Sequence, residues 1–277
     1  MTEFTKMSGG GNDFVVLAQE EAPAEADLAD WVRRVCRRGL STGADGVLVL
    51  GPSSTADVRL VHYNADGGRS SLCGNGTRCA ARWTQRRQGC VGQVMLETDC
   101  GLVQARFLPD EQVSILLPFV CSVPQWRRVP LEDAVAVEGY FVEVGIPHFL
   151  VPVESFGEVE VQQTGCALRR HSMFAPQGTN VSFVIHNDDG SLDLRTFERG
   201  VEAETLACGT ACVAAAILAV ERTWSRTPVV CHTRSGLDLR VELEAGAEGY
   251  HGLRLQGDAR FIYEGRLAPE ALQWIGG

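Results

Sequence analysis

Short apolar runs recur along the first half of the chain, each bounded by Gly, Pro, Asp or Ser. Runs of this length, rich in Val, Leu and Phe and closed by turn residues, are typical of β-strands. They predict strands at Asp13–Leu17, Gly46–Leu50, Val58–Tyr63, Val94–Glu97, Leu102–Phe107 and Val113–Leu116.

Two segments predict helices instead, Asn75–Arg87 and Thr210–Arg222. The second is apolar nearly all round, which is the pattern of a helix buried on every side. Its longest apolar run, Ala211–Val220, is too short to cross a bilayer. We therefore expect a central core helix.

Both helices follow the same kind of elbow, a cysteine and a glycine in a turn of small residues. Cys73 lies in "SLCGNGTRC" and Cys208 in "LACGTACVAAAIL", 135 positions apart. Two further pairs match at that offset: "TDCGLVQAR" with "TRSGLDLRV", and "TGADGVLVL" with "QGTNVSFVI". "GNDFVVL" and "YNADG" match "GIPHFLV" and "FERG" at an offset of 134. Five matches in one order indicate a duplicated unit.

The duplication predicts an α/β chain of the α+β type with two similar domains related by a pseudo-twofold axis. Each would be a mostly antiparallel sheet or barrel wrapped around one helix. We place the boundary near "LPFVCSVP", so that residues 1–118 carry Cys73 and residues 119–261 carry Cys208. A C-terminal strand at about 262–277 is expected to complete the first domain.

The charge and the cysteines narrow the class of protein. The 277 residues carry a net charge of −10, which disfavours a nucleic-acid or acidic-membrane partner. The N-terminus lacks the pattern of a signal peptide, and the ten cysteines show no zinc spacing. We expect a cytoplasmic protein with reduced thiols and no metal, acting on a small molecule or binding a protein.

The elbows suggest acid–base chemistry. A helix N-terminus carries partial positive charge and unsatisfied N–H groups, so it lowers a cysteine pKa and binds carboxylates. Two such cysteines facing one another could remove a proton from one side of a carbon and deliver another from the opposite side. That inverts the carbon without a cofactor, because one acid and one base exchange roles with the direction of reaction.

Other interpretations of these motifs are weaker. "GGGNDF" does not fit a dinucleotide loop, because Phe14 stands where the third glycine belongs and no helix follows. The remaining eight cysteines are expected to be packing residues: Cys36, Cys79, Cys90, Cys100, Cys121, Cys166, Cys212 and Cys231.

Together, "GGGNDFVVL", "YNADG", "CGNGTRC", "GIPHFLV" and "FERGVEAETLACGT" resemble the ordered motifs of the diaminopimelate epimerase family. The resemblance runs from Met7 to about Ala216. It implies a cofactor-independent epimerase that interconverts LL- and meso-diaminopimelate in lysine biosynthesis. It also implies a homodimer, and a site in the cleft between two similar domains.

The resemblance also implies roles for individual residues. Cys73 and Cys208 match the catalytic pair, and His148 matches a histidine that supports catalysis. The residues that match substrate contacts are Asn12, Asn64, Gly74, Asn75, Asn180, Glu198, Arg199, Gly209 and Thr210. Among them, Glu198 and Arg199 match the pair at the distal end of the substrate, where a zwitterion needs one charge of each sign.

The chain departs from the family pattern at Ile146, which stands where the family has an asparagine that contacts the distal end. A racemase of the same fold acting on another amino acid, such as histidine, is therefore the alternative function. A third hypothesis, from a different class, is a redox sensor or binding protein in which Cys73 and Cys208 close into a disulfide.

Overall fold

The computed structural model describes residues 1–131, 135–247 and 249–273. Its contacts divide the chain into two compact units. Unit 1 comprises residues 1–118 and 257–277, and unit 2 comprises residues 119–256. The end of the expected closing strand, residues 274–277, lies outside the described residues.

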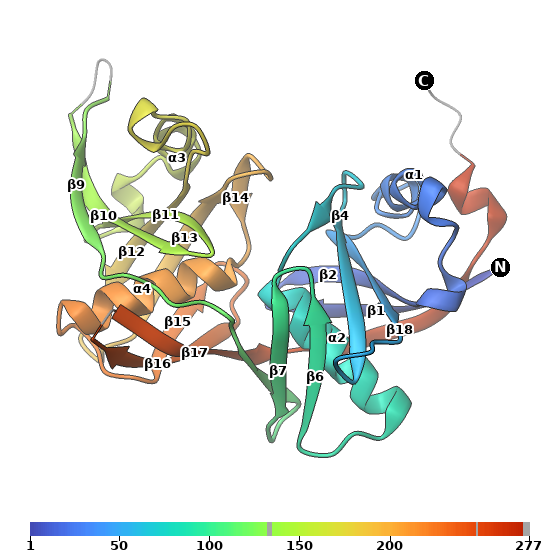
Figure 1. Cartoon of the computed structure of the whole chain (residues 1–277). Coiled ribbons are helices and arrows are strands. Elements are labelled where there is room, and N and C mark those ends of the chain that lie inside the picture. Colours follow the sequence, from blue (N-terminus) through green and yellow to red (C-terminus); the bar gives the residue numbers. More distant parts are fainter. Residues whose placement is uncertain (132–134, 248, 274–277) are drawn as a thin grey trace. The chain divides into compact units, whose positions relative to one another are not determined.

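Unit 1 is a continuous run of paired strands (Figure 1). The order is β18-β1-β2-β3-β4-β6-β7-β8, with β5 added to β4, and only β2–β3 and β4–β6 among these described pairs are parallel. The strands are β1 (Thr2–Gly9), β2 (Asn12–Ala18), β3 (Gly46–Gly51), β4 (Val58–Asn64), β5 (Arg69–Ser70), β6 (Gln93–Thr98), β7 (Gly101–Phe107), β8 (Gln112–Leu116) and β18 (Arg260–Leu267).

Unit 2 repeats this succession. Its order is β9-β10-β11-β12-β13-β15-β16-β17, with β14 added to β13, and the parallel pairs are again the third and the fifth, β11–β12 and β13–β15. The strands are β9 (Gln125–Val129), β10 (Val137–Val144), β11 (Ile146–Pro152), β12 (Asn180–His186), β13 (Leu192–Glu198), β14 (Ala203–Thr205), β15 (Val229–Thr233), β16 (Asp238–Gly246) and β17 (Gly249–Asp258). The duplicated α+β fold is confirmed.

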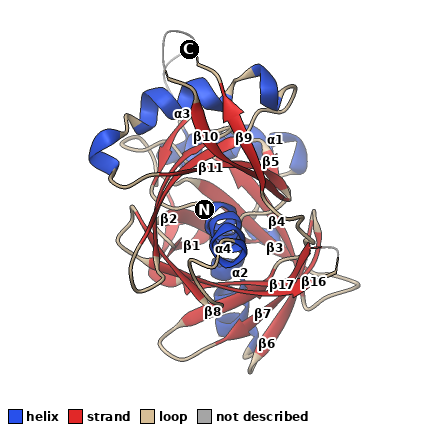
Figure 2. Ribbon diagram, turned by 90° about the vertical axis from the view of Figure 1, so that its left-hand side faces the viewer, coloured by secondary structure: helices blue, strands red, loops and turns tan. Residues whose placement is uncertain are grey.

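Each unit surrounds one helix. In unit 1, α2 (Gly74–Gln88) packs against β1, β2, β3, β4, β6, β7 and β8. In unit 2, α4 (Gly209–Glu221) packs against β10, β11, β12, β13, β15 and β16, and Figure 2 shows it end-on among strands. Residues 211–219 of α4 are all buried. The two helices predicted from the sequence are confirmed.

Two outer helices were not expected, α1 (Glu25–Val35) and α3 (Val161–Arg169). In α1 the buried residues Leu28, Trp31, Val32 and Val35 follow the spacing of an amphipathic helix. Helix α3 lies close to β13, because Gly165 lacks the Cβ that would come within 2.6 Å of the Phe197 Cβ. The described ranges also contain short 3₁₀ turns at Gln19–Glu21, Phe156–Glu158, Ser172–Phe174 and Pro269–Leu272.

The strand registers correct one of the sequence matches. Phe14 pairs with Gly46, and His148 pairs with Asn180. Asn180 is therefore equivalent to Gly46 at an offset of 134, whereas the match at 135 placed it opposite Asp45. The offset changes to 135 only at the elbows, where β14 is one residue longer than β5.

None of the helices in the described ranges has the length and apolar character that a membrane span needs. The interiors do contain two buried imidazoles, His62 in β4 and His148 in β11. Neither ring nitrogen of either residue has a hydrogen-bond partner among the described residues. Burial lowers the pKa of His62 to about 4. Burial, helped by the charge of Arg199, lowers the pKa of His148 to about 3.

These imidazoles make stability fall in mild acid. The unfolded chain binds their protons near the ordinary histidine pKa, and the folded protein does not, so stability falls as the pH drops below about 6.5. We expect His62 alone to account for about 2 kcal/mol of lost unfolding free energy between pH 7 and pH 5. Urea unfolding at both pH values would measure it.

His62→Phe should retain about that much more stability at pH 5 than the wild type, relative to pH 7. His251→Gln, which changes an imidazole at the surface, is the control and should keep the wild-type loss. An equal loss in His62→Phe and wild type would contradict the assignment.

Candidate active site

The first elbow is the N-terminus of α2. Cys73 is its N-cap residue, with extended backbone angles of φ −130° and ψ 111°. Its sulfur accepts a hydrogen bond from the Gly76 N–H at 3.5 Å, and its carbonyl accepts from the Thr77 N–H at 2.8 Å. Gly76 brings the helix close to the sheet, since a Cβ there would lie 3.0 Å from a methyl carbon of Leu48. The Cys73 sulfur thus lies beside the N–H groups of the first turn of the helix.

The second elbow has the same geometry at the N-terminus of α4. Cys208 is the N-cap residue, with φ −123° and ψ 110°. Its carbonyl accepts from the Cys212 N–H at 3.1 Å, and its sulfur lies 3.5 Å from the Thr210 hydroxyl oxygen. Both cysteines therefore stand where a helix presents unsatisfied N–H groups to an anion.

The expected lowering of the cysteine pKa is wrong for Cys208. Burial raises the pKa of this thiol well above its ordinary value, the charge of Glu198 raises it further, and a hydrogen bond from Thr210 opposes both. The thiol is only 8% exposed, so loss of hydration outweighs the helix N-terminus. Cys208 is consequently a thiol at neutral pH.

In unit 1 two of the expected substrate contacts lie together. The side-chain amide of Asn75, in the first turn of α2, donates to Asn12 Oδ1 at 2.7 Å. Asn12 begins β2 and is half-buried, whereas Asn75 is 3% exposed. Asn64 lies exposed at the end of β4, where its N–H donates to the Gly68 carbonyl at 2.8 Å.

In unit 2 a second polar group forms around the end of β13. Asn180 Oδ1 accepts from the Arg199 N–H at 2.8 Å, and Asn180 is the register partner of His148. The Nδ2 of Asn180 is buried without a hydrogen-bond partner among the described residues. A buried donor left unsatisfied costs free energy, which a ligand oxygen would recover.

The charged pair beside this group is held by its neighbours. Glu198 Oε1 accepts from the Thr205 hydroxyl at 2.5 Å. Arg199 Nη1 donates to the Gln177 carbonyl at 3.3 Å. Ile146 is half-buried at the start of β11, at the position equivalent to Asn12.

The structure adds residues that the sequence did not single out. Arg78 is fully buried and bonded to Asn75, Asp45 accepts from Asn12, and Thr205 holds Glu198. Arg78 lies inside the motif "CGNGTRC", but nothing local in the sequence indicates that it is buried. The contacts of Asp45 and Thr205 depend on which strands pair. Among the described residues no group of His, Cys, Asp and Glu is arranged to hold a metal.

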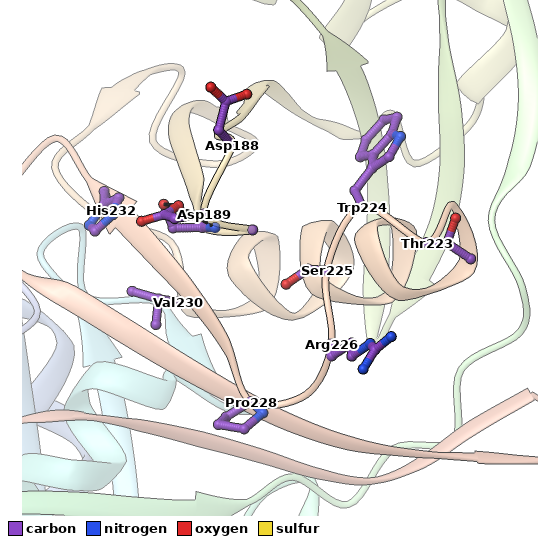
Figure 3. Close-up of a pocket in the computed structure, with 11 residues that line it drawn as sticks. Asp188, Asp189, Thr223, Trp224, Ser225, Arg226, Pro228, Val230 and His232 are labelled. Carbon is purple, nitrogen blue, oxygen red and sulfur yellow. Dashed lines mark hydrogen bonds between the residues drawn. The ribbon is translucent and has the colours of Figure 1, made fainter.

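A separate cavity of about 460 Å³ lies in unit 2 beside the β12–β13 turn and the loop after α4. Two of its lining residues are engaged locally: Asp189 accepts from Ser191, and His232 bonds at 2.7 Å to Asp238, which raises the pKa of the imidazole. In Figure 3 the Asp188 carboxylate and the Trp224 indole each point toward the top of the view, at separate places. These groups do not converge on a ligand, and the elbows remain the candidate site.

Solved structures define the class of fold. The chain is similar to a hydroxyproline epimerase from Agrobacterium vitis, with a TM-score of 0.73, 18% identity, and coverage of 97% of this chain and 92% of that one. It is also similar to a probable proline racemase from Agrobacterium radiobacter, with a TM-score of 0.75, 18% identity, and coverage of 99% and 96%. At such identities the likeness shows the fold alone, which this chain shares with both proteins.

The sequence defines the family within that fold. The family model for diaminopimelate epimerase matches residues 4–117 and 140–261. A diaminopimelate epimerase from Aquifex aeolicus is 37% identical over 98% of this chain and 100% of its own length, and one from Archaeoglobus fulgidus is 33% identical over 98% of each. The chain belongs to the diaminopimelate epimerase family. This confirms the resemblance found in the motifs and the enzyme class, an isomerase.

The pKa of Cys208 can be tested by removing the negative charge beside it. Glu198→Gln should lower this pKa, because the repulsion between carboxylate and thiolate is lost. The measurement is the pH dependence of methyl methanethiosulfonate labelling at Cys208, read by peptide mass spectrometry. The half-maximal rate should move to lower pH. Glu160→Gln, at an exposed position, is the control, and equal profiles in the two variants would contradict the assignment.

Proposed function

We propose that this protein is a diaminopimelate epimerase that interconverts the LL and meso forms by two-cysteine acid–base catalysis. The observation that carries the proposal is the pair of cysteine N-caps, whose backbone angles agree within 7° in φ and 1° in ψ. They occur in a chain of the matching family. Two elbows of the same backbone geometry suit the inversion of one carbon, because each face needs its own proton carrier.

Because Cys208 is a thiol, it donates a proton in this direction of the reaction, and Cys73 acts as the base. Cys73 Sγ takes the proton from the α-carbon, and the electrons of the broken C–H bond move toward the carboxylate. The Cys208 S–H bond then breaks, its proton forms a new C–H bond on the opposite face, and Cys208 is left as thiolate. The reverse reaction begins from that state, so the pair exchanges roles and protons balance.

The elbow N–H groups stabilise the carboxylate while it gains enolate character. Gly74 and Asn75 in unit 1, and Gly209 and Thr210 in unit 2, follow the cysteines in the first helical turns. Donors fixed in place before the charge develops need no reorganisation, which makes this kind of stabilisation large. No further group is required for the proton transfers themselves.

The distal end of the substrate is assigned to Glu198 and Arg199, and Asn12, Asn64 and Asn180 are assigned as further substrate contacts. Glu198 would face the ammonium group and Arg199 the carboxylate, and His148 would support the site as a neutral imidazole. Ile146 provides no hydrogen bond there, so a racemase for another amino acid, such as histidine, is the second candidate. We place the activity in lysine biosynthesis and in the cytoplasm.

The function is tested by exchange of the α-hydrogen with deuterium oxide, using reduced protein without added cofactor. Deuterium should enter diaminopimelate, and Cys73→Ser or Cys208→Ser should each lower turnover by roughly 10²- to 10⁴-fold. Cys166→Ser, which alters a cysteine outside the elbows, is the matched control.

Other amino acids, histidine included, are assayed beside diaminopimelate. Deuterium entering only another amino acid would establish the second candidate instead. Near wild-type turnover in either elbow variant would rule out the two-cysteine mechanism. A reduced protein that turns over nothing, yet forms a Cys73–Cys208 disulfide, would favour the redox hypothesis.

We further propose a homodimer formed along β18. β18 pairs with β1 in antiparallel register. Ile262 and Tyr263 on this strand are 52% and 46% exposed, and Tyr263 packs edge-on against Phe4 at 5.8 Å between ring centroids. Exposed apolar residues side by side on a strand form a surface suited to subunit pairing.

Ile262→Asp should convert the dimer to a monomer, because a carboxylate would be buried without a partner in the interface. Sedimentation velocity would show the mass of two chains for the wild type and of one chain for the variant. Val91→Asp, at a position 92% exposed and away from β18, should stay dimeric. A wild type with the mass of one chain would overturn the proposal.

A further inference from the structure

Arg78 is the largest fully buried side chain of the described residues, and the elbow chemistry above does not use it. It lies in α2, five positions after Cys73. Its Nη2 donates to Asn75 Oδ1 at 2.7 Å, and its Nε donates to the Asp258 carbonyl at 3.2 Å. A buried guanidinium is costly to leave without hydrogen bonds, and these two contacts fix the position of the side chain.

A line of hydrogen bonds runs from Arg78 to the sheet. After Arg78 and Asn75, the Asn75 Nδ2 donates to Asn12 Oδ1 at 2.7 Å, and Asn12 Nδ2 donates to Asp45 Oδ2 at 3.1 Å. Arg78 can only donate, and the Asp45 side chain accepts from Asn12, from the Asp13 N–H and from Arg38. The orientation of both amides between them is therefore fixed.

The rest of unit 1 closes around this line. Gly10 passes directly over it, since a Cβ there would lie 2.9 Å from Asn75 Oδ1 and 3.1 Å from Arg78 Nη2. At the other end, Arg38 Nη2 donates to Asp45 Oδ1 at 2.8 Å. Arg78 forms one end of the line, and Arg38 bonds to the aspartate at the other end. A cation therefore holds each end.

The positions of unit 2 that are equivalent to Arg78, Asn75 and Asn12 contain neither a guanidinium nor a side-chain amide. Val213 corresponds to Arg78 and Thr210 to Asn75 at the helix offset, and Ile146 corresponds to Asn12 at the strand offset. Val213 is fully buried. The guanidinium and both amides are thus absent together from one copy of a duplicated fold, as expected if they act as one device.

We propose that Arg78 is a positioning residue that makes Asn12 a fixed hydrogen-bond donor to a carboxylate of the substrate. With Oδ1 of Asn12 turned toward Asn75, the half-exposed amide keeps one Nδ2–H for the ligand. A donor in this position favours an acceptor oxygen and disfavours an ammonium group. The inference rests on the proposed function, because it needs an amino-acid substrate bound by Asn12.

A double-mutant cycle tests whether Arg78 acts through Asn12. Arg78→Met should raise the KM for diaminopimelate about tenfold, with kcat changed less than about threefold. In an Asn12→Ser background the same change should alter KM less than about twofold, since the amide it orients is gone. Arg78→Lys, which keeps a donor, should recover part of the loss.

Thr84→Val is the matched control, because Thr84 is a buried polar residue of the same helix that donates to the Ala80 carbonyl. It should leave KM unchanged in both backgrounds. Losses that add in the Arg78 and Asn12 double variant would overturn the proposal and indicate a structural role for Arg78.

A second measurement does not depend on turnover. In the nitrogen-15 NMR spectrum, Arg78→Met should shift the side-chain amide signals of both Asn75 and Asn12, while Arg78→Lys keeps them near the wild-type positions. An Asn12 signal that Arg78→Met leaves unchanged would overturn the positioning role. Absence of exchange with every amino acid in the wild type would refute the proposed function, and the amide signals would still decide whether Arg78 orients Asn12.

Discussion

The constraint on which unit 2 depends is that the middle of its central helix has no side exposed to water. Helix α4 buries every residue from 211 to 219, so apolar surface must surround it on all sides. Strands on several sides meet that demand, and they leave the helix N-terminus as the place where its unpaired N–H groups are reached. A helix wrapped for stability therefore creates an anion-binding elbow at the same time.

The duplicated fold holds two chemically unequal elbows. In unit 1 the first turn of α2 is backed by a buried cation and two amides. In unit 2 the sulfur of Cys208 lies in an apolar setting near the Glu198 carboxylate, and both raise its pKa. Nearly equal backbone angles thus give one elbow backed by polar groups and one elbow whose cysteine retains its proton. The inequality suits a reaction whose two faces need an acid and a base rather than two equal groups.

The sequence predicted β2, β3, β4, β6, β7, β8 and both central helices, because apolar periodicity and turn residues are local signals. It missed α1, although Leu28, Trp31, Val32 and Val35 carry the spacing of a helix face. It could not predict the burial of Arg78, whose main-chain acceptor, Asp258, is 180 positions away in the chain. The pKa of Cys208 was predicted with the wrong sign for a similar reason, since the helix terminus is visible in the sequence and the depth of burial is not.

The pairing of β1 with β18 sets the two units apart in the sequence separation of their contacts. Thr2 pairs with Leu267, whereas the β10–β11 and β15–β16 pairs join segments within residues 119–256. Bringing two distant segments together costs loop-closure entropy before their contacts repay it, so pairings of this kind form slowly. The sheet of the unit that carries Cys73 therefore depends on a slower folding step than those two pairs of unit 2 require.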